Sequence, residues 1–335
     1  MKIGNFDTDQ RVFVIAEIGN NHEGSLAEAK KLVQAAAEAG VNAVKFQTFR
    51  PNLYASSDQK ERLARLKNFE LTKENWSQLA ELSNQLGVFF FSTPFDLPSA
   101  EDLNPIQDLF KISSGDNSFW PLIQKVASFR KPTLISTGLA DKEHLRQMIS
   151  FWKKHSTTDL LALLHCVASY PTPSDQADLA AIRTLATEFS GLTIGYSDHT
   201  LGIDAAPLAV AAGARVVEKH FTLDKKRSEF RDHQISADPL EMWGLVSKIR
   251  DCEKMLGRGV LGIRNCERTN SQAMRRSVAA ARPLSAGAVL GRNDLIWVRP
   301  GTGIPPGQED LVLGRKLLCE KRQGEVIFEK DLSAQ

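Results

Sequence analysis

The chain has 335 residues, which suits one large α/β domain of about 250 residues followed by a small one. Hydrophobic residues make up 42% of it and charged residues 24%, a globular composition that excludes an intrinsically disordered chain. The formal net charge of +2 offers no excess of positive charge for nucleic acid or an anionic membrane, so we expect neither as a partner. The first ten residues lack the apolar region of a signal peptide, and the four cysteines form no C-x-x-C pair. Together these features predict a cytoplasmic protein with reduced thiols.

Short apolar runs recur along the chain, each bounded by polar or turn residues. They are rich in Val, Ile, Leu and Phe and do not alternate with polar residues, which is typical of strands buried on both faces of a parallel sheet. We predict strands at 12–19, 43–48, 87–94, 109–114, 132–137, 160–166, 192–199 and 214–220.

Segments with a helical period separate these runs. The clearest is 26–39, which has Ser25 placed to cap its start and Gly40 to end it. Further helices are predicted at 72–86, 141–155, 175–189 and 238–256. Strands alternating with helices in this way predict a (β/α)8 barrel, a TIM barrel, over residues 1–260. A doubly wound open sheet is the alternative, but no G-x-G-x-x-G follows the first strand.

The remaining chain differs in composition. Residues 261–275 carry many polar residues without a convincing period, so we predict a linker there. Residues 276–335 hold three β-like pieces, at 277–284, 294–301 and 325–332, separated by Gly and Pro turns. A β-rich domain of this size is near the lower limit for independent folding, so we expect it to pack against another surface.

Two lysines lie on strongly apolar predicted strands, Lys45 on the second and Lys111 on the fourth. A buried ammonium is costly unless it meets an anion, and the carboxyl ends of barrel strands carry the chemistry. With Ser114, Ser136 and Ser197 at the same end, the lysines predict a cradle for phosphate and carboxylate. Two alternatives remain: each lysine pairs with a neighbouring acid, or one forms the Schiff base of an aldolase.

His199 and His220 follow the seventh and eighth predicted strands. Neighbouring parallel strands lie about 4.8 Å apart, so both imidazoles can reach one metal ion. With few protein ligands and an oxygen neighbour such as Glu17, the site would suit Mn²⁺ or Mg²⁺ and leave positions open for substrate.

At this point the sequence resembles the sialic acid synthase (N-acetylneuraminate synthase) family. The resemblance covers nearly the whole chain. The matching stretches are IAEIGNNHEG, AVKFQTF, FFSTPFD, FKISSGD, LISTGLA, LHCVASYPTP, IGYSDHT, VEKHFTLD, RRSVAAARPLSAG and IWVRPGTGI.

The resemblance implies a (β/α)8 barrel followed by a small antifreeze-like β-clip (SAF) domain. It implies a transferase that condenses phosphoenolpyruvate with an N-acylated hexose, giving a nonulosonic acid and phosphate. It also implies a divalent metal and a domain-swapped homodimer, in which the small domain of one chain covers the barrel mouth of the other.

Roles follow from the matching positions. His199 and His220 would be the metal ligands, and Glu17 the acid/base. The positions that would hold phosphoenolpyruvate are Lys45, Thr93, Lys111, Ser114, Ser136 and Ser197. The positions on the sugar side are Gln47, Phe95, Asp116, Tyr170, Asp232 and, from the partner chain, Arg299.

Two positions depart from the pattern of family members that act on N-acetylmannosamine. This chain has Asp116 where they tend to have Glu, and Ala168 where they tend to have Asn. The acceptor could therefore be a diacetamido-trideoxyhexose that leads to legionaminic or pseudaminic acid. A homologue of the spore-coat-polysaccharide type and a non-catalytic sugar-binding protein are further alternatives.

Overall fold

The computed structural model describes residues 1–334. Its contacts divide the chain into two compact units, Met1–Gly257 and a second one that begins at Arg258. The predicted boundary at residue 260 lies close to this division.

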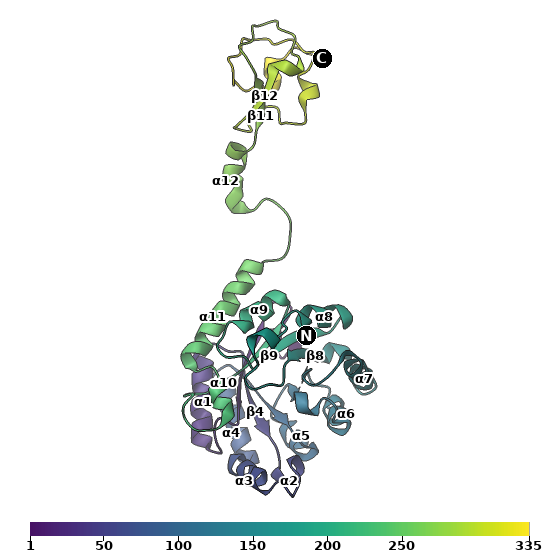
Figure 1. The fold of residues 1–335 in the computed structure, drawn as a ribbon, viewed down its shortest axis with the longest axis vertical. Coiled ribbons are helices and arrows are strands. Elements are labelled where there is room, and N and C mark those ends of the chain that lie inside the picture. Colours follow the sequence, from purple (N-terminus) through teal and green to yellow (C-terminus); the bar gives the residue numbers. More distant parts are fainter. Residues whose placement is uncertain (335) are drawn as a thin grey trace. The chain divides into compact units, whose positions relative to one another are not determined.

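The first unit is a nearly closed barrel of eight parallel strands (Figure 1). Hydrogen bonds join them in the order β5-β4-β3-β10-β9-β8-β7-β6, and β5 lies beside β6. The strands are β3 (Phe13–Gly19), β4 (Ala43–Thr48), β5 (Phe89–Pro94), β6 (Phe110–Ile112), β7 (Thr133–Ser136), β8 (Leu161–Cys166), β9 (Thr193–Asp198) and β10 (Val216–His220). All eight predicted strands are confirmed, because each is buried on both faces, as its apolar run indicates.

Helices surround the strands in this unit (Figure 1). They are α1 (Leu26–Glu38), α4 (Lys73–Gln85), α5 (Leu97–Leu103), α6 (Trp120–Ser128), α7 (Lys142–Lys153), α8 (Ala181–Glu188), α9 (Ala205–Ala212) and α11 (Pro239–Leu256). Three further helices, α2 (Pro51–Tyr54), α3 (Lys60–Phe69) and α10 (Arg231–Ile235), lie in the connections after β4 and β10. The expected caps are present: Ser25 accepts the backbone N–H of Glu28, and Gly40 has a positive φ of 83°.

The predicted helix at 175–189 is wrong in its first half. A single 3-10 turn occupies Ser174–Gln176, and helix α8 begins only at Ala181. Asp178 between them has a φ of +42°, a left-handed conformation that no helix can contain.

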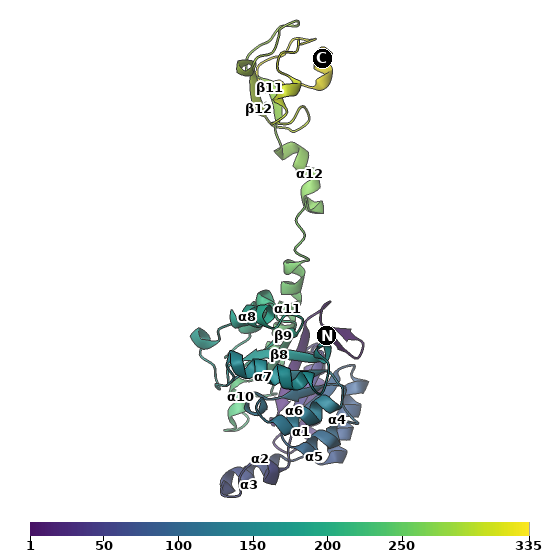
Figure 2. The same cartoon turned by 90° about the vertical axis from the view of Figure 1, so that its right-hand side faces the viewer.

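The two ends of the barrel differ in chemistry. At the amino end, a hairpin of β1 (Lys2–Ile3) and β2 (Phe6–Asp7) places the fully buried Ile3 in one cluster with Phe13, Phe91 and Leu109. Burying one such side chain contributes roughly 1.5–3 kcal/mol. Figure 2 shows the hairpin and helix α10 on opposite sides of this unit. The apolar hairpin covers the amino end, so a polar site belongs at the carboxyl end.

The second unit has its own core. Helix α12 (Asn265–Met274) precedes an antiparallel pair of strands, β11 (Ser277–Ala280) and β12 (Leu295–Val298). Buried apolar side chains such as Val278, Leu290 and Ile327 pack together. The third predicted β-piece, 325–332, forms no strand but two isolated bridges, Val326 with Ala279 and Leu332 with Leu317.

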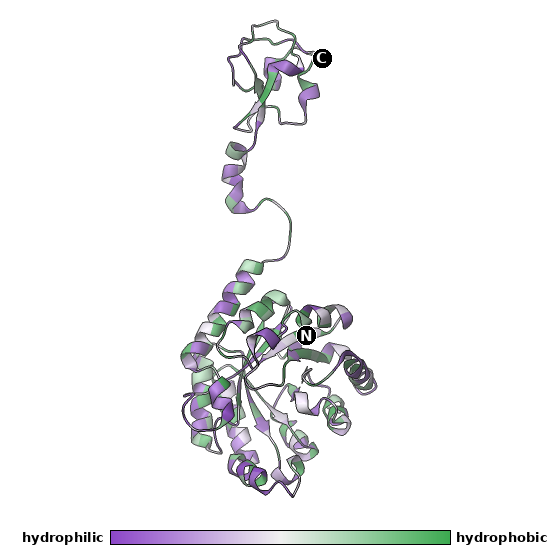
Figure 3. Ribbon diagram, viewed as in Figure 1, coloured by the Kyte–Doolittle hydropathy of each residue, from purple (hydrophilic) through white to green (hydrophobic). Residues whose placement is uncertain are grey.

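Helix α12 lies within the predicted linker, where we expected no regular structure. None of its residues is buried in the chain, and Figure 3 shows it as largely hydrophilic. A helix without a buried face has no apolar period, so the pattern that reveals the barrel helices is missing here.

Among the described residues, no helix has the length and apolar character needed to cross a membrane.

Candidate active site

Charged side chains enter the barrel at the carboxyl ends of its strands. Because successive residues of a strand face opposite sides, each charged residue shares a face with the residue two positions before it. The buried residues two positions before Glu17, Lys45, Lys111 and Glu218 are Ile15, Ala43, Leu109 and Val216, all members of the cluster that fills the barrel. The side chain of the neighbouring Lys219 lies on the opposite face of the sheet, where its Nζ is 3.1 Å from Asp198 Oδ2.

Glu17, Lys45, Lys111 and Glu218 form one buried ion cluster. Lys45 Nζ lies 2.7 Å from Glu17 Oε2 and 3.6 Å from Glu218 Oε2, and it donates to Thr93 Oγ1 at 3.2 Å. Lys111 Nζ donates to Ser136 Oγ at 2.7 Å and lies 4.0 Å from Glu218 Oε1. Two ammonium groups therefore face two carboxylates, which balances the buried charge.

The pKa values follow from burial and from these partners. Burial raises the pKa of Glu17 to about 7, although Lys45 lowers it in part. Burial also acts on Glu218, but Lys111 and Lys45 overcome it and lower the pKa of this carboxyl. Burial lowers the pKa of Lys111, whereas the acids beside Lys45 outweigh burial and raise the pKa of that lysine. Glu17 is thus the carboxyl that can exchange a proton near neutral pH.

Serine hydroxyls complete the polar lining. Ser197 Oγ donates to Glu218 Oε1 at 2.9 Å. Ser114 Oγ is buried and has no hydrogen-bond partner among residues 1–334. A buried hydroxyl without a partner is rare, and it is free to bond to a ligand.

The two histidines lie together, with ring centroids 5.4 Å apart. Nδ1 of His199 is 2.8 Å from the Val167 carbonyl oxygen, which leaves Nε2 to bind a ligand, and Tyr170 packs on the same ring at 4.0 Å. Nδ1 of His220 is buried without a partner among the described residues, and burial holds the pKa of His220 well below its usual value.

This pair fits a divalent cation. Nδ1 of His220 has no partner in residues 1–334, and burial favours its neutral form, the form of imidazole that binds metal. For His199, burial lowers the pKa, but Cys166 and the Val167 carbonyl oxygen outweigh burial and raise it. No third His, Cys, Asp or Glu in the described chain completes a metal-binding group with them. Water and substrate oxygens would supply the remaining ligands.

Two of the positions expected on the sugar side contact the groups described above: Gln47 bonds to Glu17, and Tyr170 packs on His199. Gln47 Nε2 donates to Glu17 Oε1 at 3.0 Å, and Asp116 accepts a hydrogen bond from Ser113 Oγ at 2.6 Å. Asp232 on α10 is buried, and its burial raises its pKa. Phe95 packs on Tyr54 with ring centroids 4.7 Å apart. Arg299 belongs to the second unit, where it follows β12 and is exposed.

Sequence reasoning missed several residues of the site. Glu218 is central to the ion cluster, and its position two before His220 on one strand is a signal that could have revealed it. The guanidinium of Arg231 lies 4.6 Å from the centre of the Tyr170 ring. Arg231 and Tyr54 both lie on helices too short to show a helical period in the sequence. Cys166 Sγ lies 3.7 Å from His199 Nδ1.

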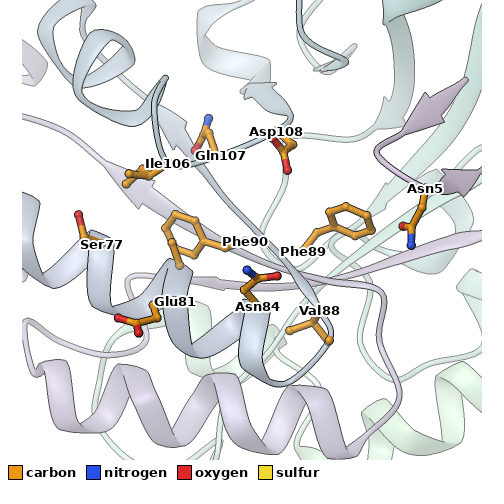
Figure 4. Close-up of a pocket in the computed structure, with 12 residues that line it drawn as sticks. Asn5, Ser77, Glu81, Asn84, Val88, Phe89, Phe90, Ile106, Gln107 and Asp108 are labelled. Carbon is orange, nitrogen blue, oxygen red and sulfur yellow. The ribbon is translucent and has the colours of Figure 1, made fainter.

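A separate hollow of about 530 Å³ lies at the amino end of the barrel (Figure 4). Its walls come from helix α4, the start of β5 and the segment before β6, with Asn5 of the hairpin nearby. It contains none of the ion cluster or the histidines, so it is distinct from the candidate active site.

Two family profiles match most of the chain. The profile of the NeuB family matches residues 32–261, and that of the SAF domain matches residues 275–333. The N,N'-diacetyllegionaminic acid synthase of Legionella pneumophila is 41% identical, over 96% of this chain and 95% of its own. The pseudaminic acid synthase of Campylobacter jejuni serotype O:23/36 is 34% identical, over 99% of both chains.

Solved structures agree in fold. A sialic acid synthetase from Leptospira borgpetersenii has a TM-score of 0.76 and 36% identity, over 81% of this chain and 94% of its own. A putative spore coat polysaccharide biosynthesis protein E from Chromobacterium violaceum has a TM-score of 0.81 and 27% identity, over 97% of this chain and 100% of its own. The family profile covers more than half of the chain, and the identities extend over nearly all of it. The chain therefore belongs to the NeuB family of sialic (nonulosonic) acid synthases, and it is an enzyme with a TIM-type barrel and a C-terminal SAF domain.

Proposed function

We propose that this enzyme condenses phosphoenolpyruvate with an N-acylated hexose, giving a nonulosonic acid and phosphate. The observation that carries the proposal is the pair of buried lysines, Lys45 and Lys111, among hydroxyl groups at the carboxyl end of the barrel. Two fixed ammonium groups suit a ligand that bears both a phosphate and a carboxylate. The named activities of the related synthases support the same reaction class.

Phosphoenolpyruvate would replace the acids as partner of the lysines. In the free enzyme, Glu17 and Glu218 neutralise Lys45 and Lys111. The ligand would accept hydrogen bonds from both ammonium groups. The hydroxyl groups available to it are those of Thr93, Ser114, Ser136 and Ser197, of which Ser114 has no other partner among the described residues.

His199 and His220 would hold a divalent cation, Mn²⁺ or Mg²⁺, through the ring nitrogens that no described residue satisfies. Such a cation, when bound, acts as a Lewis acid toward the aldehyde oxygen of the open-chain sugar. The protein supplies the rest of the chemistry from fixed side chains.

The reaction forms a C–C bond to the aldehyde carbon and a C–O bond from water to C2, and it breaks the C2–O bond to phosphate. C3 of phosphoenolpyruvate attacks the aldehyde carbon, and positive charge develops at C2. Water adds at C2 while one of its protons passes to the Glu17 carboxylate, and the former aldehyde oxygen takes up a proton to become a hydroxyl. The C2–O bond to phosphate then breaks, phosphate leaves with the electron pair, and the C2 hydroxyl loses its proton to give the keto group. A carboxyl with a pKa of about 7 is matched to this proton transfer, and the two lysines hold the reacting carbon in place.

For the acceptor we propose a diacetamido-trideoxyhexose rather than N-acetylmannosamine. Asp116 is shorter than the Glu typical of members acting on N-acetylmannosamine, and Ala168 removes an amide. Both changes enlarge the space available for a second N-acyl group. The groups proposed to contact this sugar are Gln47, Phe95, Asp116, Tyr170 and Asp232.

We also propose that the enzyme works as a domain-swapped homodimer, with Arg299 of one chain completing the site of the other. This proposal follows from the family resemblance of the IWVRPGTGI stretch and from the exposure of Arg299 in its own unit. The small SAF domain, with few buried side chains, would gain a packing surface in such a dimer.

Phosphate release from phosphoenolpyruvate tests the proposed reaction. The protein is stripped with EDTA, Mn²⁺ is added back, and either N-acetylmannosamine or a 2,4-diacetamido-2,4,6-trideoxyhexose is offered. We expect release only with metal and sugar together, and faster with the diacetamido sugar. Release without sugar, or none with either sugar, would contradict the proposal.

A Schiff-base aldolase and a sugar-binding protein make different predictions. An aldolase would be trapped by borohydride on Lys45 or Lys111 and would need no metal. Lys45 suits that role poorly, because the carboxylates of Glu17 and Glu218 raise its pKa and keep it charged. Burial lowers the pKa of Lys111, so Lys111 is the lysine that the borohydride test examines. A binding protein would bind the sugar without releasing phosphate.

A further inference from the structure

A chain of side-chain hydrogen bonds leads from Asn20 to the proposed acid/base. Asn20 Nδ2 donates to Gln47 Oε1 at 2.9 Å, and Gln47 Nε2 donates to Glu17 Oε1 at 3.0 Å. The other carboxylate oxygen, Glu17 Oε2, lies 2.7 Å from Lys45 Nζ. The Glu17 carboxylate is therefore held on one side by an ammonium group and on the other by an amide.

Only one orientation of the Gln47 amide allows it to hydrogen-bond to the Glu17 carboxylate. An ionised carboxylate only accepts hydrogen bonds, so Gln47 must present its NH₂ group and turn its carbonyl oxygen away. Asn20 meets that carbonyl oxygen with a donor. If the Gln47 amide were reversed, two acceptor atoms would face each other at Glu17 and two donors at Asn20.

The backbone between Glu17 and Asn20 leaves room for the hydrogen bond from Gln47 to Glu17. The pairing of β3 with β4 shifts register between Glu17 and Gly19, and Gly19 has a φ of +54°. A Cβ atom at Gly19 would lie 3.1 Å from Glu17 Oε1 and 3.2 Å from Gln47 Nε2. The bulge thus leaves just enough room for the Gln47–Glu17 hydrogen bond and brings Asn20 to the far end of the Gln47 amide.

Asn20 differs in role from its neighbour Asn21, although both are buried. Asn21 Nδ2 donates to the Phe221 carbonyl oxygen and to Ser236 Oγ, which ties the loop after β3 to the segment after β10. The side chain of Asn20 has its one hydrogen bond within residues 1–334 to Gln47, and its Oδ1 has no partner there. The bond of Asn21 is structural, whereas that of Asn20 serves the Gln47 amide.

We propose that Asn20 is a positioning residue, which fixes the Gln47 amide so that it orients Glu17 for catalysis. This role rests on the proposed function, in which Glu17 accepts the proton of water. It adds a residue that acts through Gln47. Residues that orient a group in this way typically contribute about 10- to 100-fold to activity.

A double-mutant cycle tests the coupling in the full-length enzyme. We expect Asn20→Ala to lower kcat about 10- to 100-fold, with the KM for phosphoenolpyruvate changed by less than about twofold. In the Gln47→Ala background, the same substitution should change kcat by less than about twofold, because its target is gone. Independent, multiplicative losses in the double variant would overturn the proposal.

Asn20→Asp and Asn21→Ala are the matched variants. Asn20→Asp keeps the size of the side chain but replaces the donor with an acceptor, so its kcat should fall at least as far as that of Asn20→Ala. Asn21→Ala should lower the melting temperature, while kcat stays within about threefold of the parent enzyme. A normal kcat for Asn20→Asp would contradict the proposal.

A crystal structure of Asn20→Asp gives an answer that does not depend on turnover. We expect the Gln47 side chain to leave Glu17 Oε1, with Nε2 more than 3.5 Å from it. If Gln47 keeps its contact with Glu17, Asn20 does not position it and the proposal fails. Absence of phosphate release by the parent enzyme would instead refute the proposed reaction, which separates the two failures.

Discussion

Glu17 and Lys45 face each other at 2.7 Å, yet their environments act on them differently. Glu17 has a single strong cationic partner and is fully enclosed, so burial dominates and raises its pKa to about 7. Lys45 is attracted by two carboxylates, those of Glu17 and Glu218, and stays charged. One site thus contains both a permanent cation for the anionic substrate and a carboxyl that can change its charge.

The pH dependence of the reaction follows from the Glu17 carboxyl. A general base must be ionised, and its ionised fraction grows as the pH rises through a pKa of about 7. We therefore expect kcat/KM to rise through pH 7 and to level off above it, measured with metal held in excess. A value that falls as the pH rises through the same range would show that the protonated form is active.

Lys111→Met tests the anion cradle. Methionine preserves the stem but removes the charge, and hydrogen bonds to charged groups are worth about 1.5–3 kcal/mol, a factor of about 10 to 100. We expect the KM for phosphoenolpyruvate to rise by that factor. Lys219→Met is the control: Lys219 is equally buried but pairs with Asp198 outside the cluster, so it should lower stability and leave KM unchanged.

At the scale of elements, the strands and helices that could be predicted are those whose buried residues leave an apolar run or a helical period in the sequence. Every barrel strand is an apolar run, and α1, α4, α7 and α11 show a helical period with a cap. Helix α9 (AAPLAVAA) is apolar on all sides and has no period to detect. Helix α12 fails for the opposite reason, because no side of it is buried in this chain.

The same contrast applies to the candidate site. Lysines on apolar strands and histidines at strand ends are conspicuous, so Lys45, Lys111, His199 and His220 could be named from the sequence. For Glu218, the sequence offers only its position two residues before His220. Its importance comes from two lysines on other strands, and that proximity exists only in the closed barrel.

Strand β9, which carries Ser197 and leads into His199, depends on a glycine. A Cβ atom at Gly195 would lie 2.6 Å from the Val216 carbonyl oxygen and 2.4 Å from Leu164 Cδ2. Backbone cannot yield as a side chain can, so Gly195→Ala should destabilise the barrel by about 1–3 kcal/mol, seen as a lower urea midpoint. Gly262→Ala, which meets no atom within 4 Å, should stay within about 0.5 kcal/mol of the parent.

At the scale of the whole molecule, the residues proposed for the site come from both units. The ion cluster and the histidines lie in Met1–Gly257, and Arg299 lies in the SAF unit. If the SAF domain of one chain completes the barrel of another, neither chain has a full site alone.

Complementation tests this division. Lys45→Met and Arg299→Ala should each be nearly inactive, but co-expression should form mixed dimers in which one site has both residues. We expect recovery of about a quarter of the parent activity from equal amounts of the two chains. If Arg299 acts in its own chain, the mixture will stay as inactive as the separate variants.

The fate of the bridging oxygen of phosphoenolpyruvate distinguishes C–O from P–O cleavage. The substrate is labelled with ¹⁸O between C2 and phosphorus and is turned over with metal and the diacetamido sugar. Attack by C3 and addition of water at C2 require C–O cleavage, so mass spectrometry should find the label in phosphate and none in the nonulosonic acid. Label retained at C2 of the acid, or phosphate formed without a new acid, would contradict the account.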